Sequence, residues 1–131
     1  MKIKTIKSLV DEAMQIVTTI EPKEAKTLLE LDNYLLIDIR DIRELWKFGT
    51  VKGARHIPRG MLEFWLDPES PYFKSDLKVE IVKILYCASN WRSALASEAL
   101  MEMGFTNIMH VKGGFQALID AGFSIQKVEQ K

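Results

Sequence analysis

Two kinds of hydrophobic pattern alternate along the chain. Short, nearly continuous apolar runs are typical of strands buried on both faces of a sheet, and they occur at residues 34–40, 80–86 and 106–111, with a shorter run at 18–20. Other segments repeat apolar residues three and four positions apart, the spacing of one helical face. They predict helices at about 7–18, from Pro22, and at 42–48, 59–66, 94–103 and after Gly113. Strands alternating with helices predict an α/β fold.

The first of these helices is amphipathic. Its apolar face is formed by Leu9, Val10, Ala13, Met14, Ile16 and Val17. Such a face usually packs over the core of its own domain, and a contact with a second copy of the chain is the alternative. We therefore expect residues 1–19 to form a helical extension packed on a domain at 20–131, with a dimer through this helix as the other arrangement.

Composition excludes several classes of protein. The 131 residues suit one domain, and 47% hydrophobic and 27% charged residues are ordinary for a soluble globular chain. With 18 basic and 18 acidic side chains, nothing favours nucleic acid or an anionic membrane as partner. No segment approaches membrane-spanning length or resembles a secretory signal. The single cysteine excludes an intrachain disulfide and suits a reducing compartment, so we expect a cytoplasmic protein.

That cysteine opens a polar loop between a predicted strand and a predicted helix, Cys87-Ala88-Ser89-Asn90-Trp91-Arg92-Ser93. The first N–H groups of a helix have no intrahelical partner, and the helix dipole adds positive potential there. Such a loop can cradle an anion, and the same potential favours a cysteine thiolate. Arg92 adds a cation with a planar donor fork. The pattern predicts a nucleophilic sulfur beside an oxyanion pocket; the alternative is an inert buried cysteine.

The loop resembles the active-site loop of rhodanese-like (thiosulfate sulfurtransferase-like) domains, which has Cys, two variable residues, Gly, one variable residue, Arg, then Ser or Thr. The spacing from Cys87 to Arg92 matches, and Asn90 stands at the Gly position. Because Asn tolerates a positive φ angle, we expect Asn90 to keep the left-handed backbone of that Gly. The segments 38–40, 49–58 and 112–118 also resemble motifs of this family, so the likeness covers about residues 20–125.

The resemblance implies a rhodanese-like three-layer fold, with a mostly parallel five-stranded sheet and helices on both faces. It also implies a sulfurtransferase. Cys87 would attack a small sulfur-donor anion such as thiosulfate, become a persulfide, and pass the sulfur to a thiol or to cyanide. The backbone of the loop would bind the donor's oxygens, with Arg92 assisting. The candidate substrate-binding residues are Ala88, Ser89, Asn90, Trp91, Arg92, Ser93 and Arg59.

Some nearby residues have two interpretations. Arg59 could bind the donor or be a solvated charge, and Trp91 or Trp65 could shield a persulfide or simply pack in the core. We expect Asp38, Arg40 and His56 to be structural polar residues near the site, since buried charges need partners. No cofactor is expected. His56 has no second ligand at metal-binding spacing, so no metal site is predicted either.

Two other functions remain open. Relatives of the same fold use a Cys–Arg loop for phosphate or arsenate, as phosphatases or arsenate reductases, but their loop is one residue longer than the stretch from Cys87 to Arg92. A tetrahedral oxyanion needs the wider ring of amides, and fold alone does not decide function. The other alternative is a sulfur-carrier or regulatory rhodanese module without turnover. The presence of both Cys87 and Arg92 weakens it.

Overall fold

A computed structural model describes all of residues 1–131. Its central sheet has five parallel strands in the order β1-β6-β5-β2-β4. The strands are β1 (Thr19–Ile20), β2 (Tyr34–Asp38), β4 (Arg55–His56), β5 (Val82–Tyr86) and β6 (Ile108–Val111). A separate antiparallel pair joins β3 (Thr50–Val51) to β7 (Ile125–Gln126). The predicted α/β fold with a five-stranded parallel sheet is confirmed.

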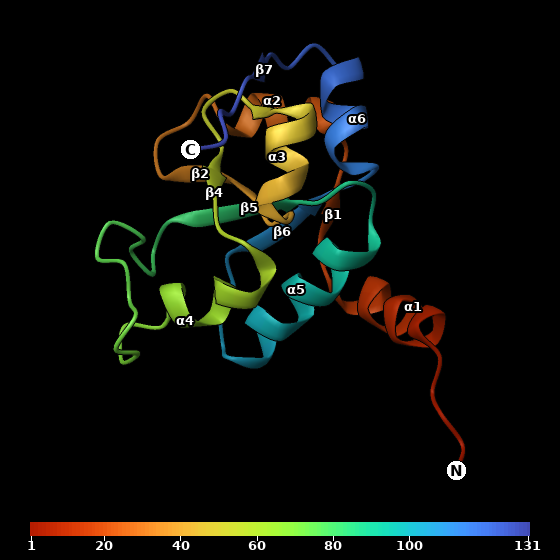
Figure 1. Cartoon of the computed structure of the whole chain (residues 1–131). Helices are drawn as coiled ribbons and strands as arrows, with labels where there is room; N and C mark the ends of the chain where they lie inside the picture. Colours follow the sequence, from red (N-terminus) through yellow and green to blue (C-terminus); the bar gives the residue numbers. More distant parts are fainter.

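Helices cover both faces of the sheet (Figure 1). On one side lie α2 (Pro22–Leu28), α3 (Ile42–Phe48) and α6 (Gly114–Asp120), and on the other lie α4 (Leu62–Leu66) and α5 (Trp91–Glu102). A short 3-10 helix, η1 (Arg59–Met61), leads into α4, and α1 (Ile6–Ile16) lies beside α5 at the end of the molecule. No helix has the length and apolar composition needed to cross a membrane.

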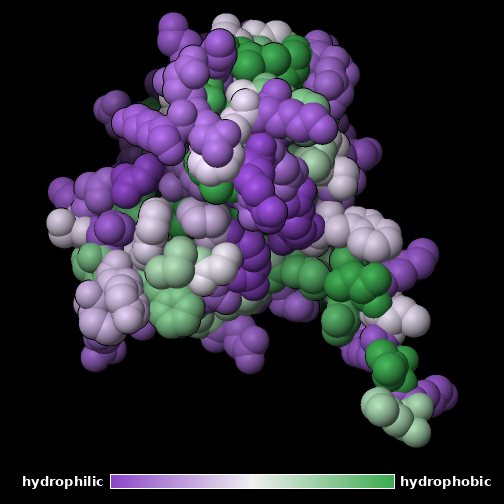
Figure 2. All heavy atoms as spheres, in the orientation of Figure 1, coloured by the Kyte–Doolittle hydropathy of each residue, from purple (hydrophilic) through white to green (hydrophobic).

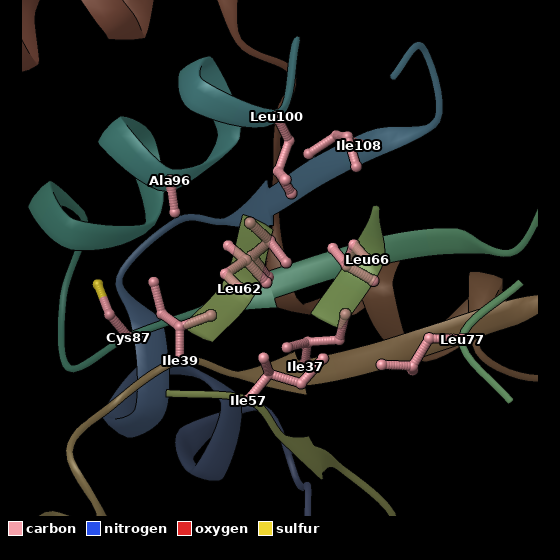
Figure 3. Close-up of a cluster of buried hydrophobic side chains, with 11 residues drawn as sticks. Ile37, Ile39, Ile57, Leu62, Leu66, Leu77, Cys87, Ala96, Leu100 and Ile108 are labelled. Carbon is pink, nitrogen blue, oxygen red and sulfur yellow. The ribbon is translucent and has the colours of Figure 1, made fainter. Parts of the chain in front are cut away.

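Alternation along the strands divides the core into two clusters, because successive strand side chains point to opposite faces. On β5, Leu85 and the following Cys87 face α4 and α5, whereas Ile84 and Tyr86 face α2 and α6. Figure 3 shows the first cluster, with the sulfur of Cys87 directed toward the start of α5. This cluster contains Ile37, Ile39, Ile57, Leu62, Leu66, Leu77, Leu85, Cys87, Ala96, Leu100 and Ile108.

The N-terminal helix α1 packs on α5 through a small third cluster. Val10 and Ala13 of α1 are buried against Ala94 of α5, with Met14 and Leu95 beside them. Thr5 caps the helix by accepting a hydrogen bond from Ser8 N at 3.0 Å, which satisfies one of the free N–H groups of the first turn. The helix therefore adds a layer outside α5 instead of covering the sheet.

Three local features of the structure differ from the prediction made from the sequence. Helix α1 ends at Ile16, before the predicted end near residue 18, because the chain becomes extended at Val17 to enter β1. Helix α5 begins at Trp91, three residues before Ala94, where the sequence pattern placed its start. Strands β3 and β7 were not predicted, because two-residue strands are too short to show a periodic pattern.

Candidate active site

Cys87 directly follows β5, at the edge of the sheet where the parallel strands end. Its side chain is 1% exposed and belongs to the core, while Ala88 and Ser89 at the tip of the loop are exposed. The thiol therefore lies at the base of the loop and not on its outer surface. Sγ accepts a hydrogen bond from Ser93 N at 3.4 Å, so the first turn of α5 points an amide at the sulfur.

The loop amides above Cys87 are free. Within this loop, the backbone N–H groups without a hydrogen bond to the protein are those of Ala88, Ser89, Asn90, Trp91 and Arg92. Consecutive free amides at the start of a helix form a concave site for an anion, supported by the helix dipole. The Cys87 sulfur thus lies at the start of a loop with five consecutive amides that have no partner in the protein.

The backbone conformation of Asn90 differs from the one predicted from the sequence. Its φ is −134° and its ψ is −29°, so it does not adopt the left-handed backbone expected for a residue replacing Gly. The reason is a side-chain interaction, in which Oδ1 accepts a hydrogen bond from Gly113 N at 2.9 Å. Asn90 thus ties the Cys loop to the loop before α6, a role that Gly lacks the side chain to perform.

Gly113 and Gly114 bring the β6–α6 turn against the Cys loop. Gly114 has a φ of +63°, and a Cβ there would lie 2.7 Å from the carbonyl oxygen of Ala88. Phe115 N also donates to Cys87 O at 2.9 Å. Only Gly permits this close approach together with the positive φ. The Gly-Gly motif therefore shapes the back of the Cys loop.

A buried polar chain runs from the sulfur to β1. Ser93 Oγ lies 3.5 Å from Cys87 Sγ and 2.8 Å from His110 Nδ1. His110 Nε2 lies 2.8 Å from Thr19 Oγ1. Burial lowers the pKa of His110 to about 4, so the ring is neutral at physiological pH and carries one proton. The Cys87 thiol donates to Ser93 Oγ, and the Ser93 hydroxyl donates to Asn90 O at 3.3 Å.

His110 and Thr19 were not predicted as site residues. The signal for His110 was its place two positions after Ile108, which puts both side chains on the α5 face of β6. A polar side chain on the buried face of a strand needs a partner. The sequence did not identify that partner, because Ser93 lies on a different element.

Arg92 does not reach into the loop. Its Nη1 and Nη2 donate to the two carboxylate oxygens of Glu44 on α3, at 2.7 and 3.0 Å. Hydrogen bonding from Arg92 lowers the pKa of Glu44, and the same bond raises the pKa of Arg92. The sequence predicted that the Arg92 guanidinium would bind the oxygens of the sulfur donor. It binds the carboxylate of Glu44 instead, a residue that was not predicted to lie near the site.

Arg59 and the two tryptophans have other neighbours. Arg59 N donates to Ile39 O at 3.0 Å, which places η1 beside the end of β2, and its Nη1 donates to Glu63 at 2.7 Å. Trp91 is 47% exposed. Trp65 packs partly against the first core cluster, with Lys74 Nζ 4.9 Å from its ring centroid.

Asp38 and Arg40 form a buried ion pair at the end of β2. Arg40 Nη2 donates to Asp38 at 2.9 Å and to Gly49 O at 2.7 Å, and Tyr86 OH donates to Asp38 at 2.6 Å. Burial raises the pKa of Asp38, but hydrogen bonds from Arg40 and Tyr86 outweigh that effect and lower it. His56 Nε2 lies 2.7 Å from Arg40 O. No group of three or more His, Cys, Asp or Glu side chains is arranged to hold a metal ion.

Known proteins are similar to this chain in sequence and in architecture. The family model for the rhodanese-like domain matches residues 21–121. The chain is 33% identical over 110 residues to a Mycobacterium tuberculosis protein named probable adenylyltransferase/sulfurtransferase MoeZ, an alignment covering 82% of this chain and 26% of that protein. It therefore spans about a quarter of the length of that relative.

Two solved structures extend the comparison. One, from Rhodopseudomonas palustris, is a protein of unknown function described as a possible tyrosine phosphatase; it has 38% identity, a TM-score of 0.88, and coverage of 96% of this chain and 97% of that one. The other is the polysulfide-sulfur transferase homodimer of Wolinella succinogenes, with 32% identity, a TM-score of 0.69, and coverage of 93% and 87%. These matches confirm the resemblance inferred from the motifs, and the chain belongs to the rhodanese-like domain family.

Proposed function

We propose that this protein is a sulfurtransferase with Cys87 as its nucleophile. The observation that carries the proposal is that Cys87 opens a loop whose amides from Ala88 to Arg92 are free and whose next amide, Ser93 N, donates to Sγ. Relatives named as sulfurtransferases support sulfur transfer as the reaction class. The amides act on the donor's oxygens as an oxyanion cradle.

The reaction has two steps. The Cys87 thiolate attacks the outer sulfur of a sulfane donor such as thiosulfate, the S–S bond of the donor breaks, and sulfite leaves with the electron pair. Cys87 is then a persulfide. An acceptor thiolate or cyanide attacks the terminal sulfur, takes it, and returns Cys87 to the thiolate. Because the nucleophile must stay reduced, we propose a reducing compartment, the cytoplasm, as its location.

The test is mass spectrometry of the intact protein before and after incubation with thiosulfate. We expect one added sulfur atom, removable by cyanide. Cys87→Ser should remain unmodified and transfer no sulfur to cyanide, with unchanged circular dichroism because Ser is nearly isosteric. Sulfur transfer by this variant would contradict the assignment of Cys87.

Phosphate-ester hydrolysis is the second candidate, because the Rhodopseudomonas palustris structure is described as a possible tyrosine phosphatase. Two features favour sulfur transfer instead. The loop from Cys87 to Arg92 is one residue shorter than that of relatives acting on phosphate or arsenate, and Arg92 is bound by Glu44. Hydrolysis of p-nitrophenyl phosphate that depends on Cys87 would favour the phosphatase, whereas a persulfide without hydrolysis favours the transferase. A persulfide that forms but turns over no acceptor would indicate a sulfur carrier.

We also propose a homodimer through α1. The apolar side of this helix is wider than its contact with α5, and it leaves Ile6, Leu9 and Ile16 at least 39% exposed. In Figure 2 hydrophobic residues are visible over the part of the surface that α1 occupies in Figure 1. The related polysulfide-sulfur transferase is a homodimer. A second copy would remove this apolar surface from water.

A further inference from the structure

The ion pair between Glu44 and Arg92 bridges two helices beside the Cys loop. Both carboxylate oxygens of Glu44 are used, at 2.7 and 3.0 Å from the two terminal nitrogens of Arg92. Glu44 is also held by its own helix, because Asp41 N donates to its Oε1 at 3.3 Å in the capping box of α3. Arg92 lies in the first turn of α5, directly after the loop. Each partner is therefore anchored near the site by its own element.

The ion pair with Glu44 neutralises the charge of Arg92, the one cationic side chain of the Cys loop. Arg92 lies close enough to Cys87 for the sulfur's charge to contribute to the raised pKa of Arg92, after the larger effects of Glu44. Because hydrogen bonding from Arg92 lowers the pKa of Glu44, Glu44 is ionised at neutral pH. Because Arg92 and Glu44 are opposite charges in direct contact, the pair adds little net positive potential at the loop. The remaining attraction comes from loop amides and the end of a helix dipole, which carry only partial charges.

No other arginine supplies an unpaired positive charge near the loop. All five arginines of the chain are in ion pairs with carboxylates. On the elements nearest the loop, Arg40 is bound by Asp38 and Arg59 by Glu63. Lys112, which precedes the Gly113–Gly114 turn, faces Glu21 at 3.7 Å. A donor with two negative charges would meet the Cys87 thiolate with no uncompensated arginine to offset the repulsion.

We propose that Glu44 is a specificity-determining residue: by holding Arg92, it makes the site prefer sulfane-sulfur donors with one negative charge, such as thiosulfonates and persulfides, over dianions such as thiosulfate. The inference rests on the proposed sulfur transfer and names its donor class. With a thiosulfonate, the Cys87 thiolate attacks the outer sulfur, the S–S bond breaks, and a sulfinate leaves with the electron pair. With a persulfide, the leaving group is a thiolate.

The experiment compares two donors with similar sulfonyl groups and different charge, methanethiosulfonate with one negative charge and thiosulfate with two. Sulfur transfer to cyanide is measured for the wild type, Glu44→Gln and Glu24→Gln. Gln retains the capping interaction, so Arg92 is released without removing the cap. Glu24 is the matched control, because it occupies the same capping-box position in α2. We expect Glu44→Gln to raise kcat/KM for thiosulfate about tenfold, the size of one charge-assisted hydrogen bond.

Other variants should show a different response. In Glu44→Gln, kcat/KM for methanethiosulfonate should change by less than about threefold. In Glu24→Gln, kcat/KM should be unchanged for both donors. The double variant Glu44→Gln/Arg92→Gln should lose the gain with thiosulfate. A gain that survives removal of Arg92 would overturn the proposal, because it would reflect only the lost negative charge. Melting curves of each variant establish that it is folded.

Failure of this inference is separable from failure of the proposed function. If the wild-type protein forms no persulfide with either donor, sulfur transfer itself is wrong. If it forms the persulfide but Glu44→Gln leaves the ratio of kcat/KM for the two donors unchanged, sulfur transfer stands and the role of Glu44 is wrong.

Discussion

The hydroxyl oxygen of Ser93 lies 2.8 Å from Nδ1 of His110, and this contact connects the active-site loop to the neighbouring strand β6. Ser93 Oγ is also 3.5 Å from Cys87 Sγ. When the neutral His110 ring donates its Nδ1 proton to Ser93 Oγ, the hydroxyl proton is available to Asn90 O, 3.3 Å away, or to an ionised Cys87. We therefore propose that Ser93 and His110 act as positioning residues beside Cys87.

Ser93→Ala should slow persulfide formation in a single turnover by roughly 10- to 100-fold, since a hydrogen bond to a charged acceptor is worth roughly 1.5–3 kcal/mol. The matched control is Ser97→Ala, one helical turn further along α5. Ser97 Oγ is buried and has no hydrogen-bond partner, so its removal should leave the rate unchanged. Equal rates for Ser93→Ala and the wild type would show that the hydroxyl only packs against the sulfur.

The free energy of unfolding should depend on pH through the titration of His110. Its pKa is lowered by burial from 6.5 to about 4, so the unfolded chain takes up the proton first as the pH falls. The free energy of unfolding should therefore be highest above pH 6.5 and fall by about 3 kcal/mol between pH 6.5 and 4, then stop changing on account of this group. Urea titrations measure the slope, and His110→Gln should flatten it. An NMR titration of the His110 ring with a midpoint near 6.5 would contradict the prediction.

Asp38→Asn should destabilise the protein by about 3–5 kcal/mol, because it leaves the Arg40 guanidinium buried without its counter-ion. The chain offers a matched control in Asp41, which pairs with Arg43 at the same spacing but on the surface. Asp41→Asn should cost less than about 1 kcal/mol, since Asn also caps helices and exposed pairs contribute little. Similar losses in the two variants, measured by urea unfolding, would mean that the buried pair is not fully desolvated.

Gly114→Ala should disrupt the Cys loop. The new methyl group would lie 2.7 Å from Ala88 O, and the φ of +63° is strained for any L residue. Gly53→Ala separates the two effects, because Gly53 has a φ of +87° and a methyl group there would have no neighbouring atom within 4 Å. Gly53→Ala should cost about 1–2 kcal/mol from strain alone and keep its activity. Gly114→Ala should cost more and lose persulfide formation; retention of normal rates would show that the loop adjusts freely.

The proposed dimer predicts a change of mass in solution. The double variant Ile6→Glu/Ile16→Glu puts charges on the exposed apolar part of α1 and should sediment as a monomer, whereas the wild type should sediment as a dimer. Gln15→Glu adds one charge on the polar side of the same helix and should stay dimeric. A monomeric wild type at micromolar concentration would rule out this interface.

The Cys loop could be predicted because its determinants are local. An apolar run ending at Tyr86, a helical pattern ending near Gly104 and a polar loop between them place Cys87 at a strand end and its following residues at a helix start. Strand alternation is equally local, and it places Cys87 and Tyr86 on opposite faces of the sheet. Hydrophobic pattern and loop length therefore sufficed for the α/β fold and for the place of Cys87 between a strand and a helix.

The partners of these residues depended on tertiary structure. Arg92 meets Glu44 only because α3 and α5 come together across the end of the sheet, and Ser93 meets His110 only through the position of β6 beside β5. Asn90 shows the same dependence in its backbone, since the hydrogen bond to Gly113 outweighs the left-handed preference inferred from its place in the motif. Local propensities are weak compared with a buried hydrogen bond or ion pair, so contacts between distant segments decided which groups surround the sulfur.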